Sequence, residues 1–318
     1  MGRKYARASD GLGTVRPVAA FVPLPVDRTA PGTNRGVTVV PPDNGHVPYV
    51  PTDAHVVGEM LKLAGVTSAD VVYDLGCGDG RIVIAAARDF GARGVGIDID
   101  ERRIAECHEN AARAKVQNLV TFKCASFFDV EYADASVVML YLLPGVMVIL
   151  KSTFLSALRP GTRLVANHFE MGNWPEDQRV ELGGRVLRLW VVPAQVDGVW
   201  RCVMGEEEGS GFGVQSSGGK DEGGRMKDEK GHEGHGRRRF TVKLERHYQR
   251  VIGSAEIGGQ GSPVTEGVIR GEWVKFKVAD WGDGGRALFV DARVDGRVMR
   301  GICWHDEERV MEFGAVRE

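Results

Sequence analysis

Three glycines and one acidic residue, spaced as in a ligand-binding loop, follow a short apolar run early in the chain. The run covers residues 71–73, is β-branched and aromatic like a buried strand, and ends on Asp74. Glycines then occupy alternate positions: Gly76, Gly78 and Gly80. Glycine is needed where the backbone turns with φ > 0 or lies against a ligand without a Cβ in the way. Because a helix is predicted at residues 81–90, we expect a strand, a cofactor loop and a helix here.

The spacing of the glycines distinguishes between cofactors. A dinucleotide fingerprint is G-x-G-x-x-G, which places a pyrophosphate on the N-terminus of the following helix. Here the spacing is G-x-G-x-G, and Asp74 precedes the first glycine by two residues. A carboxylate at that position would repel a diphosphate but attract the ammonium and sulfonium end of S-adenosyl-L-methionine. A nicotinamide or flavin cofactor, or a glycine-rich turn without a ligand, is the less favoured alternative.

A second predicted strand repeats this pattern. Residues 94–97 form a short run that ends on Asp98. An acidic residue at the end of the second strand can accept two hydrogen bonds from a ribose diol. The order strand, acid, loop, helix, strand, acid indicates a cofactor site far more specifically than a glycine motif alone. The predicted cofactor-binding residues are Asp74, Gly76, Cys77, Gly78, Asp79, Gly80, Asp98 and Ile99.

At these residues the chain resembles the class I methyltransferases. Within the class it is most similar to a group that includes the mitochondrial protein-lysine methyltransferases of the ATP synthase c-subunit and the adenine nucleotide translocase, together with bacterial relatives. Four stretches carry this narrower likeness: residues 47–52, 74–84, 137–144 and 168–174. The likeness covers about residues 47–203. It implies a Rossmann-like, seven-stranded α/β sheet and S-adenosyl-L-methionine as cofactor.

The resemblance also implies roles for residues outside the glycine loop. In the related lysine enzymes, the region that corresponds to Tyr49, Pro51 and Thr52 covers the cofactor and the acceptor. Many relatives have an acid after the third strand that accepts the adenine amino group. The aligned residue here is Ser126, with Asp129 three positions on, and serine accepts such a hydrogen bond more weakly than a charged group. The expected adenine contacts are Ser126 and Phe127.

An acceptor site for methyl transfer needs alignment and exclusion of water more than an acid–base pair. A lysine acceptor must be neutral, and its deprotonation at pH 7 from a pKa near 10.4 costs about 4 to 5 kcal/mol. A desolvated aromatic pocket lowers that cost. Parallel sheets place ligands at the carboxyl ends of their strands. Aromatic residues expected near those ends, each of which could also be ordinary core or surface, are Tyr49, Tyr141, Phe169 and Trp174.

Two pairs of residues have weaker chemical interpretations. His168 and Glu170 would share one face of a fifth strand at residues 162–169 and could form an acid–base pair, although two solvated rim residues are the favoured interpretation. His232 and His235 form an H-x-x-H without acids or cysteines at ligand spacing. Metal binding is therefore not expected there.

Composition limits the possible classes of protein. The chain has 318 residues and a net charge of -2, so nothing in bulk favours a nucleic-acid partner. Its 5 cysteines include no C-x-x-C pair, which indicates a reducing compartment rather than a disulfide scaffold or a zinc ribbon. The most apolar run, residues 135–150, is shorter than the ~20 residues of a membrane helix. We expect no integral membrane segment and an intracellular location, cytoplasmic or mitochondrial.

The sequence divides into four predicted parts. Residues 1–46 are an Arg-rich tail that resembles a transit peptide, but their prolines prevent a continuous helix and favour disorder. Residues 47–204 are the predicted methyltransferase domain, in which residues 186–192 and 199–203 would form a closing antiparallel hairpin. Residues 205–238 are a low-complexity linker or insertion. Residues 239–318 are a β-rich extension, predicted as a small antiparallel sheet or half-barrel.

Three hypotheses about function follow. The first is an S-adenosylmethionine-dependent methyltransferase that acts on lysine in a protein substrate, without a metal. The second keeps the cofactor and changes the acceptor to a small molecule or a nucleic-acid base. Tyr-Leu-Leu-Pro at residues 141–144 differs from the Asn/Asp-Pro-Pro-Tyr loop of amino-directed nucleic-acid methylases, which speaks against a base. The third is a catalytically silent cofactor-binding module whose β-rich part mediates assembly.

Overall fold

A computed structural model describes residues 50–205, 237–281, 285–305 and 310–318. The predicted tail, Tyr49, and both His232 and His235 lie outside the described residues. No helix in the described ranges is long and apolar enough to cross a membrane. The same ranges contain no group of three or more His, Cys, Asp or Glu side chains placed to hold a metal ion.

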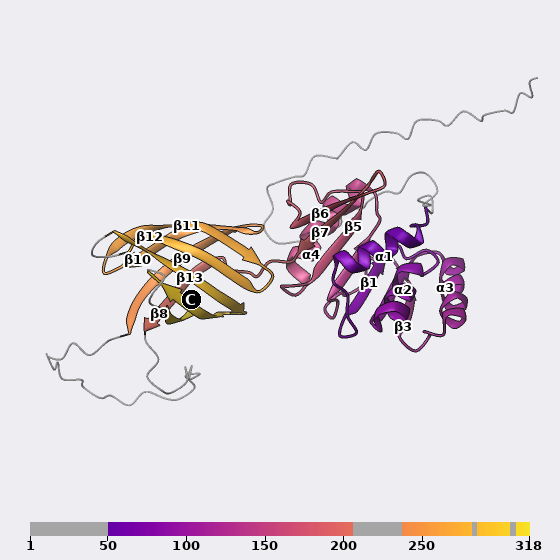
Figure 1. Cartoon of the computed structure of the whole chain (residues 1–318), viewed down its shortest axis with the longest axis horizontal. Helices are drawn as coiled ribbons and strands as arrows, with labels where there is room; N and C mark the ends of the chain where they lie inside the picture. The colour runs from indigo at the N-terminus through magenta and orange to yellow at the C-terminus, as the bar shows by residue number, and fades with distance from the viewer. Residues whose placement is uncertain (1–49, 206–236, 282–284, 306–309) are drawn as a thin grey trace, which may run out of the picture. The chain divides into compact units, whose positions relative to one another are not determined.

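The first part of the fold is a seven-stranded sheet with helices on both faces (Figure 1). The strand order is β3-β2-β1-β4-β5-β7-β6. The strands are β1 (Val71–Leu75), β2 (Arg93–Asp98), β3 (Val120–Cys124), β4 (Val137–Leu140), β5 (Arg163–Asn167), β6 (Gln178–Leu182) and β7 (Arg185–Val191). The helices are α1 (Ala54–Leu63), α2 (Arg81–Phe90), α3 (Glu101–Ala114) and α4 (Pro144–Ala157). The predicted Rossmann-like, seven-stranded α/β sheet is confirmed.

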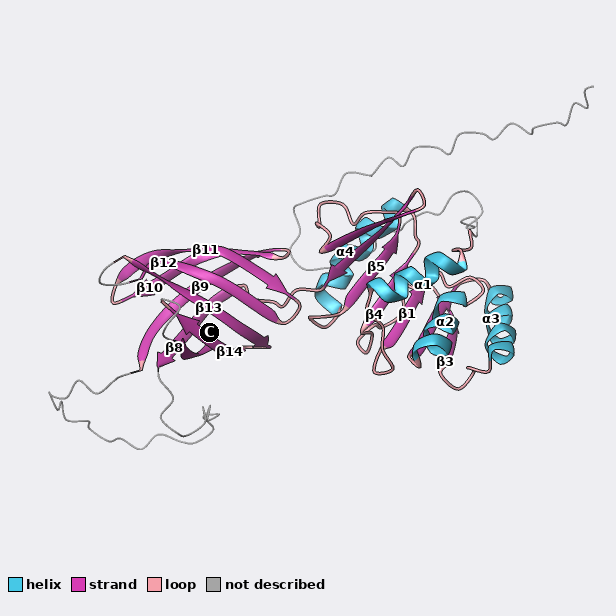
Figure 2. Ribbon diagram, in the orientation of Figure 1, coloured by secondary structure: helices cyan, strands magenta, loops and turns pink. Residues whose placement is uncertain are grey.

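Burial explains why helices cover both faces of this sheet (Figure 2). Every residue of β1 and of β4 is buried, as is typical of parallel strands inside an α/β fold. On one face, Met139 and Val165 pack in a cluster with Val57 of α1. On the other face, Leu140 packs in a cluster with Phe154 of α4. The carboxyl ends of β1, β2, β4 and β5 therefore meet at one edge, between the two helical layers.

The hairpin that closes the sheet differs from the prediction. It is formed by β6 and β7 around Gly183 and Gly184, which both have positive φ. The predicted second strand of the hairpin belongs to β8 (Gly198–Gly205), which pairs with strands of a second sheet instead. The prediction was wrong because alternating residues in β8 indicate a half-buried strand but carry no information about which sheet it joins.

The second part is a closed barrel of eight antiparallel strands. The strands after β8 are β9 (Arg238–His247), β10 (Arg250–Ile257), β11 (Gln260–Arg270), β12 (Trp273–Trp281), β13 (Arg286–Asp295), β14 (Val298–Trp304) and β15 (Val310–Arg317). Each strand pairs with the next, and β15 pairs with β8 to close the ring. The predicted antiparallel region is thus a complete barrel, and closure removes the unpaired edges that a half-barrel would have.

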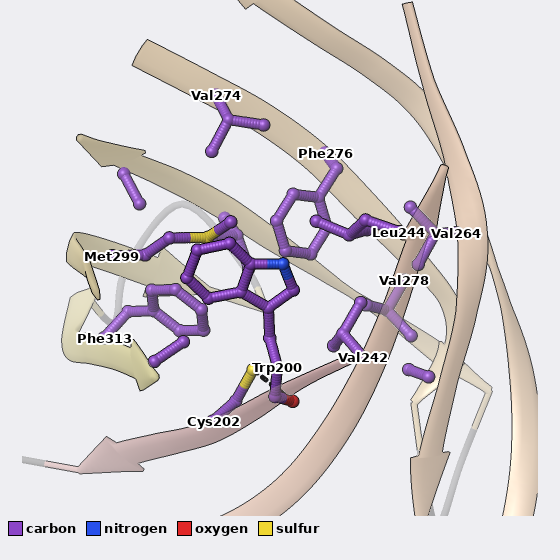
Figure 3. Packing of buried hydrophobic residues seen from close by; sticks show 14 of the residues in the cluster. Trp200, Cys202, Val242, Leu244, Val264, Val274, Phe276, Val278, Met299 and Phe313 are labelled. Carbon is purple, nitrogen blue, oxygen red and sulfur yellow. Dashed lines mark hydrogen bonds between the residues drawn. The ribbon is translucent and has the colours of Figure 1, made fainter. Parts of the chain in front are cut away.

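Apolar side chains fill the barrel interior (Figure 3). Trp200 is fully buried at its centre, and its indole Nε1 donates a hydrogen bond to the Val196 carbonyl at 2.7 Å. Phe276 and Phe313 pack edge to face with ring centroids 6.4 Å apart. The interior is therefore a packed core, as in small barrels whose side chains meet across the axis.

Candidate cofactor and acceptor site

The glycine loop after β1 has the backbone conformation that its sequence predicts. Gly76, Gly78 and Gly80 have φ of 78°, 55° and 77°, a region that residues with a Cβ rarely adopt. A Cβ on Gly80 would lie 2.9 Å from the Phe122 ring and 3.0 Å from the Cys107 sulfur. The loop is held to β2 because the amides of Gly76 and Cys77 both donate to the Ile97 carbonyl. Its shape is thus set by these backbone hydrogen bonds and by the lack of space for a side chain at Gly80.

Asp74 is a buried carboxyl group at the end of β1. It is 3 % exposed, and no donor among the described residues makes a hydrogen bond to it. Burial, followed by the negative charges of Asp98 and Asp79, raises the pKa of Asp74 to about 8. A buried carboxyl group without a positive partner is costly to ionise. The site therefore favours a ligand that brings a positive charge, as the ammonium of S-adenosyl-L-methionine does.

Asp98 ends β2 and lies directly beside the loop. Its Oδ2 accepts a hydrogen bond from the Gly78 amide at 2.9 Å, and its Oδ1 accepts one from the Asp100 amide at 3.0 Å. Each oxygen keeps a further lone pair, which suits the two hydroxyls of a ribose. The next residue, Ile99, is 60 % exposed and offers an apolar surface for a base. This donor and acceptor set fits an adenosyl group.

The other predicted cofactor residues take supporting positions. Asp79 forms an ion pair with Arg81 at 2.6 Å. The Cys77 sulfur lies 3.9 Å from that of Cys107, beneath the loop. The Ser126 hydroxyl oxygen accepts from the Phe128 amide at 3.2 Å, and Phe127 is half-buried. The roles assigned to Ser126 and Phe127 in adenine binding stay predictions.

The segment before α1 is tied to the loop on one side and to β7 on the other. Arg81 donates to the Thr52 carbonyl at 2.8 Å, which connects the segment to the start of α2. Asp53 accepts from Arg185, the first residue of β7, at 3.3 Å. Thr52 is buried at 4 % exposure, while Pro51 is exposed. The covering role of Pro51 and Thr52 stays a prediction, and Tyr49 lies outside the described residues.

The two candidate acceptor residues lie in different surroundings. Tyr141, just after β4, is half-buried and stacks on Phe169, with ring centroids 6.2 Å apart and an angle of 21° between the planes. Trp174 is 1 % exposed and packs in the core against Trp190 at 6.4 Å. Tyr141 is therefore partly accessible to an incoming acceptor, whereas Trp174 is not.

His168 and Glu170 do not form the pair that a longer fifth strand would place on one face. The strand ends at Asn167, and His168 has a φ of 80°. Glu170 is instead paired with Arg188 at 2.6 Å, and this hydrogen bond lowers the pKa of Glu170. Both side chains are exposed, as the favoured interpretation of two solvated rim residues predicts, and the sharp turn directly after Asn167 excludes the acid–base pair.

Asn167, at the carboxyl end of β5, is a buried polar residue that the motifs did not reveal. It is fully buried, at 0 % exposure, and neither its Oδ1 nor its Nδ2 has a hydrogen-bond partner among the described residues. Buried side-chain amides nearly always have partners. The only sequence signal was a polar residue that follows the apolar residues 164–166.

Comparisons with known proteins agree with this geometry. The family model of the ANTKMT methyltransferase domain matches residues 74–178. A protein-lysine N-methyltransferase of Saccharolobus islandicus is 45% identical over 130 residues, which cover 41% of this chain and 81% of that protein. The lysine N-methyltransferase of the ATP synthase c-subunit in Mus musculus is 28% identical over 165 residues, covering 52% of this chain and 61% of that protein.

A solved structure is also similar in sequence. It is an RNA methyltransferase from Salinibacter ruber in complex with S-adenosyl-L-homocysteine, 46% identical, and the match covers 46% of this chain and 96% of that one with a TM-score of 0.46. Fold, loop and relatives together define a class I methyltransferase, and the acids and glycines of the loop fit S-adenosyl-L-methionine as its cofactor. The chain belongs to the methyltransferase family that includes the Saccharolobus protein, which confirms the resemblance stated from the sequence.

Proposed function

We propose that this protein transfers a methyl group from S-adenosyl-L-methionine to the amine of a lysine in a protein substrate. The observation that carries the proposal is the 45% identity with an archaeal protein-lysine N-methyltransferase. The mouse relative also acts on a lysine, as its name states, and this chain spans 61% of its length. The class of enzyme does not determine the acceptor, so the lysine acceptor needs its own test.

The residues of the loop would hold the cofactor in a fixed orientation. Asp74 would bind the ammonium group, and ionisation of its carboxyl would be favoured by that charge. Asp98 would bind the ribose hydroxyls while it keeps the Gly78 amide in place. The bound cofactor supplies a methyl group on positively charged sulfur, so the protein has no strong acid or base chemistry to perform. Its contribution is alignment.

The acceptor edge would keep the lysine amine neutral. The stacked rings of Tyr141 and Phe169 provide an apolar surface beside the carboxyl ends of β4 and β5. An apolar surface disfavours the ammonium form of a lysine and lowers the cost of its deprotonation. The proton lost before transfer goes to water.

The test is transfer of tritium-labelled methyl groups into a total cell extract by the purified full chain. We expect the label to be removed by protease, to resist ribonuclease, and to appear in N-methyl-lysine after acid hydrolysis. Asp98→Ala is the control, because its weaker cofactor binding should reduce the labelling at a limiting cofactor concentration. Label that is removed by ribonuclease would contradict the proposal and favour RNA, the substrate named for the Salinibacter relative.

A further inference from the structure

The side chain of Asn167 is a buried amide without a partner. Both of its polar atoms are shielded from solvent, and neither makes a hydrogen bond among the described residues. Leaving such a group unsatisfied destabilises the fold, whereas an apolar group of similar shape would not. A residue of this kind at the edge where ligands bind is explained if a ligand supplies the missing partner.

The register of the sheet places Asn167 on the same face as Asp74. Asp74 pairs with Met139 of β4, and Met139 pairs with Val165 of β5. Asn167 is two residues beyond Val165, and alternate residues of a strand point to one face. Two strand spacings, about 10 Å, separate the columns of Asp74 and Asn167. The position of Asn167 is thus across the sheet edge from the carboxylate assigned to the cofactor's ammonium.

The backbone turns sharply directly after Asn167, at the end of β5. Asn167 accepts a hydrogen bond through its carbonyl from the Phe169 amide at 3.1 Å, and His168 between them has a φ of 80°. This three-residue turn is a rare and strained conformation. It ends β5 abruptly and returns Phe169 to the ring of Tyr141. The last pair between β4 and β5 is Leu140 with Ala166. Tyr141 and Asn167 are the residues that directly follow this pair in the chain.

The segment before α1 passes the same edge. Thr52 is tied to Arg81 at the start of α2, and Asp53 is tied to Arg185 at the start of β7. Leu187 of β7 pairs with Asn167. The segment is therefore bonded both to the start of α2, next to the cofactor loop, and to the strand that pairs with Asn167.

We propose that the Asn167 side chain binds the amine of the methyl acceptor. Its Oδ1 accepts a hydrogen bond from the amine N–H, so that the nitrogen lone pair faces the methyl group. The N–C bond forms as the C–S bond breaks, and the positive charge moves from sulfur to nitrogen. The methylated amine later loses a proton to water. This inference rests on the proposed function, because it assumes an amine as the acceptor.

The experiment compares, in the full chain, substitutions at the last residue of β5 and at the residue just before its first. Asn167→Leu removes the amide and fills its space. We expect a higher melting temperature, unchanged affinity for S-adenosyl-L-methionine in calorimetry, and about 100-fold slower methyl transfer into extract protein. Thr162→Val is the matched control, since Thr162 is buried at the opposite edge and donates to the Ala135 carbonyl at 3.2 Å. It should lower the melting temperature and leave transfer unchanged.

Several results would overturn this role of Asn167. Methyl transfer by Asn167→Leu at a rate close to wild type would do so, and so would a loss of cofactor affinity as large as the loss of rate. If Asn167→Leu does not fold, Asn167→Ala, which adds no atoms, replaces it. The two readouts remain the affinity for S-adenosyl-L-methionine and the rate of methyl transfer. If wild type labels RNA and not protein, the proposed function fails; if wild type labels lysine and the Asn167 variants do too, only this inference fails.

Discussion

The carboxyl edge of the seven-stranded sheet keeps polar groups buried, whereas the interior of the barrel is filled with apolar side chains. Thr52, Asp74 and Asn167 are buried at or beside that edge. In the barrel, Ser262 is the buried polar residue among those described, and the central cluster is hydrophobic throughout. Buried polar groups cost stability unless a partner satisfies them. The sheet edge is therefore adapted to a ligand, and the barrel interior to stability.

The largest expected effect is on the stability of the barrel. Trp200→Ala should destabilise it by about 3–5 kcal/mol, because a fully buried aromatic side chain leaves a cavity. Chemical denaturation followed by tryptophan fluorescence would measure the loss, and calorimetry would measure cofactor affinity on the same samples. Cofactor affinity should stay at the wild-type value. A loss of affinity would contradict the assignment of the barrel interior to stability and of the sheet edge to ligand binding.

The next effect concerns Asp74. Asp74→Ala should weaken S-adenosyl-L-methionine binding by about 100-fold, because a charge-assisted hydrogen bond to the ammonium is lost. Calorimetry measures this directly. Asp295→Ala in the barrel is the matched control, since Asp295 is exposed. Equal affinity of the Asp74 variant and the control would show that the buried carboxyl has no part in binding.

A somewhat smaller effect is expected at Asp98. Asp98→Ala should reduce cofactor affinity by about 10- to 100-fold, since the ribose contact and the hydrogen bond to the Gly78 amide are both lost. Adenosine, which lacks the methionine chain, sharpens the test when used as a competitor in the same calorimeter. It should compete in the Asp74 variant but not in the Asp98 variant, and the opposite order would exchange the two roles.

The smallest effect is a dependence on pH. The pKa of Asp74 is raised to about 8 by burial and neighbouring charges, so the free protein holds a proton there at pH 6. Binding of a cation must release this proton, and affinity should rise up to about tenfold from pH 6 to pH 7 and level off near pH 8. Without ligand the sign is opposite, because stability from the raised pKa is lost as pH rises toward 8. In Asp74→Asn, the residual affinity should not vary between pH 6 and pH 7.

The conformation of the glycine loop and the places of Asp74 and Asp98 were predictable from sequence because they depend on local spacing. The positions of the acids and glycines at the ends of β1 and β2 are determined by their spacing along the chain and not by distant segments. The acceptor half depends on where a strand stops. Asn167 ends β5 through a turn at His168, and no residue type signals that turn, since positive φ is rare outside glycine. The pairing of β8 with β15 escaped prediction because it joins residues more than 100 positions apart.

That pairing has a consequence for synthesis of the chain. On the ribosome, all seven strands of the sheet emerge before β8, and they can fold while the barrel is still incomplete. β8 must then wait, with one side unpaired, until β15 has been made. Premature termination or proteolytic loss of residues 310–317 would leave two open strand borders that attract other chains. Loss of β15 should therefore make the protein more prone to aggregation than damage in the seven-stranded sheet that leaves the barrel closed.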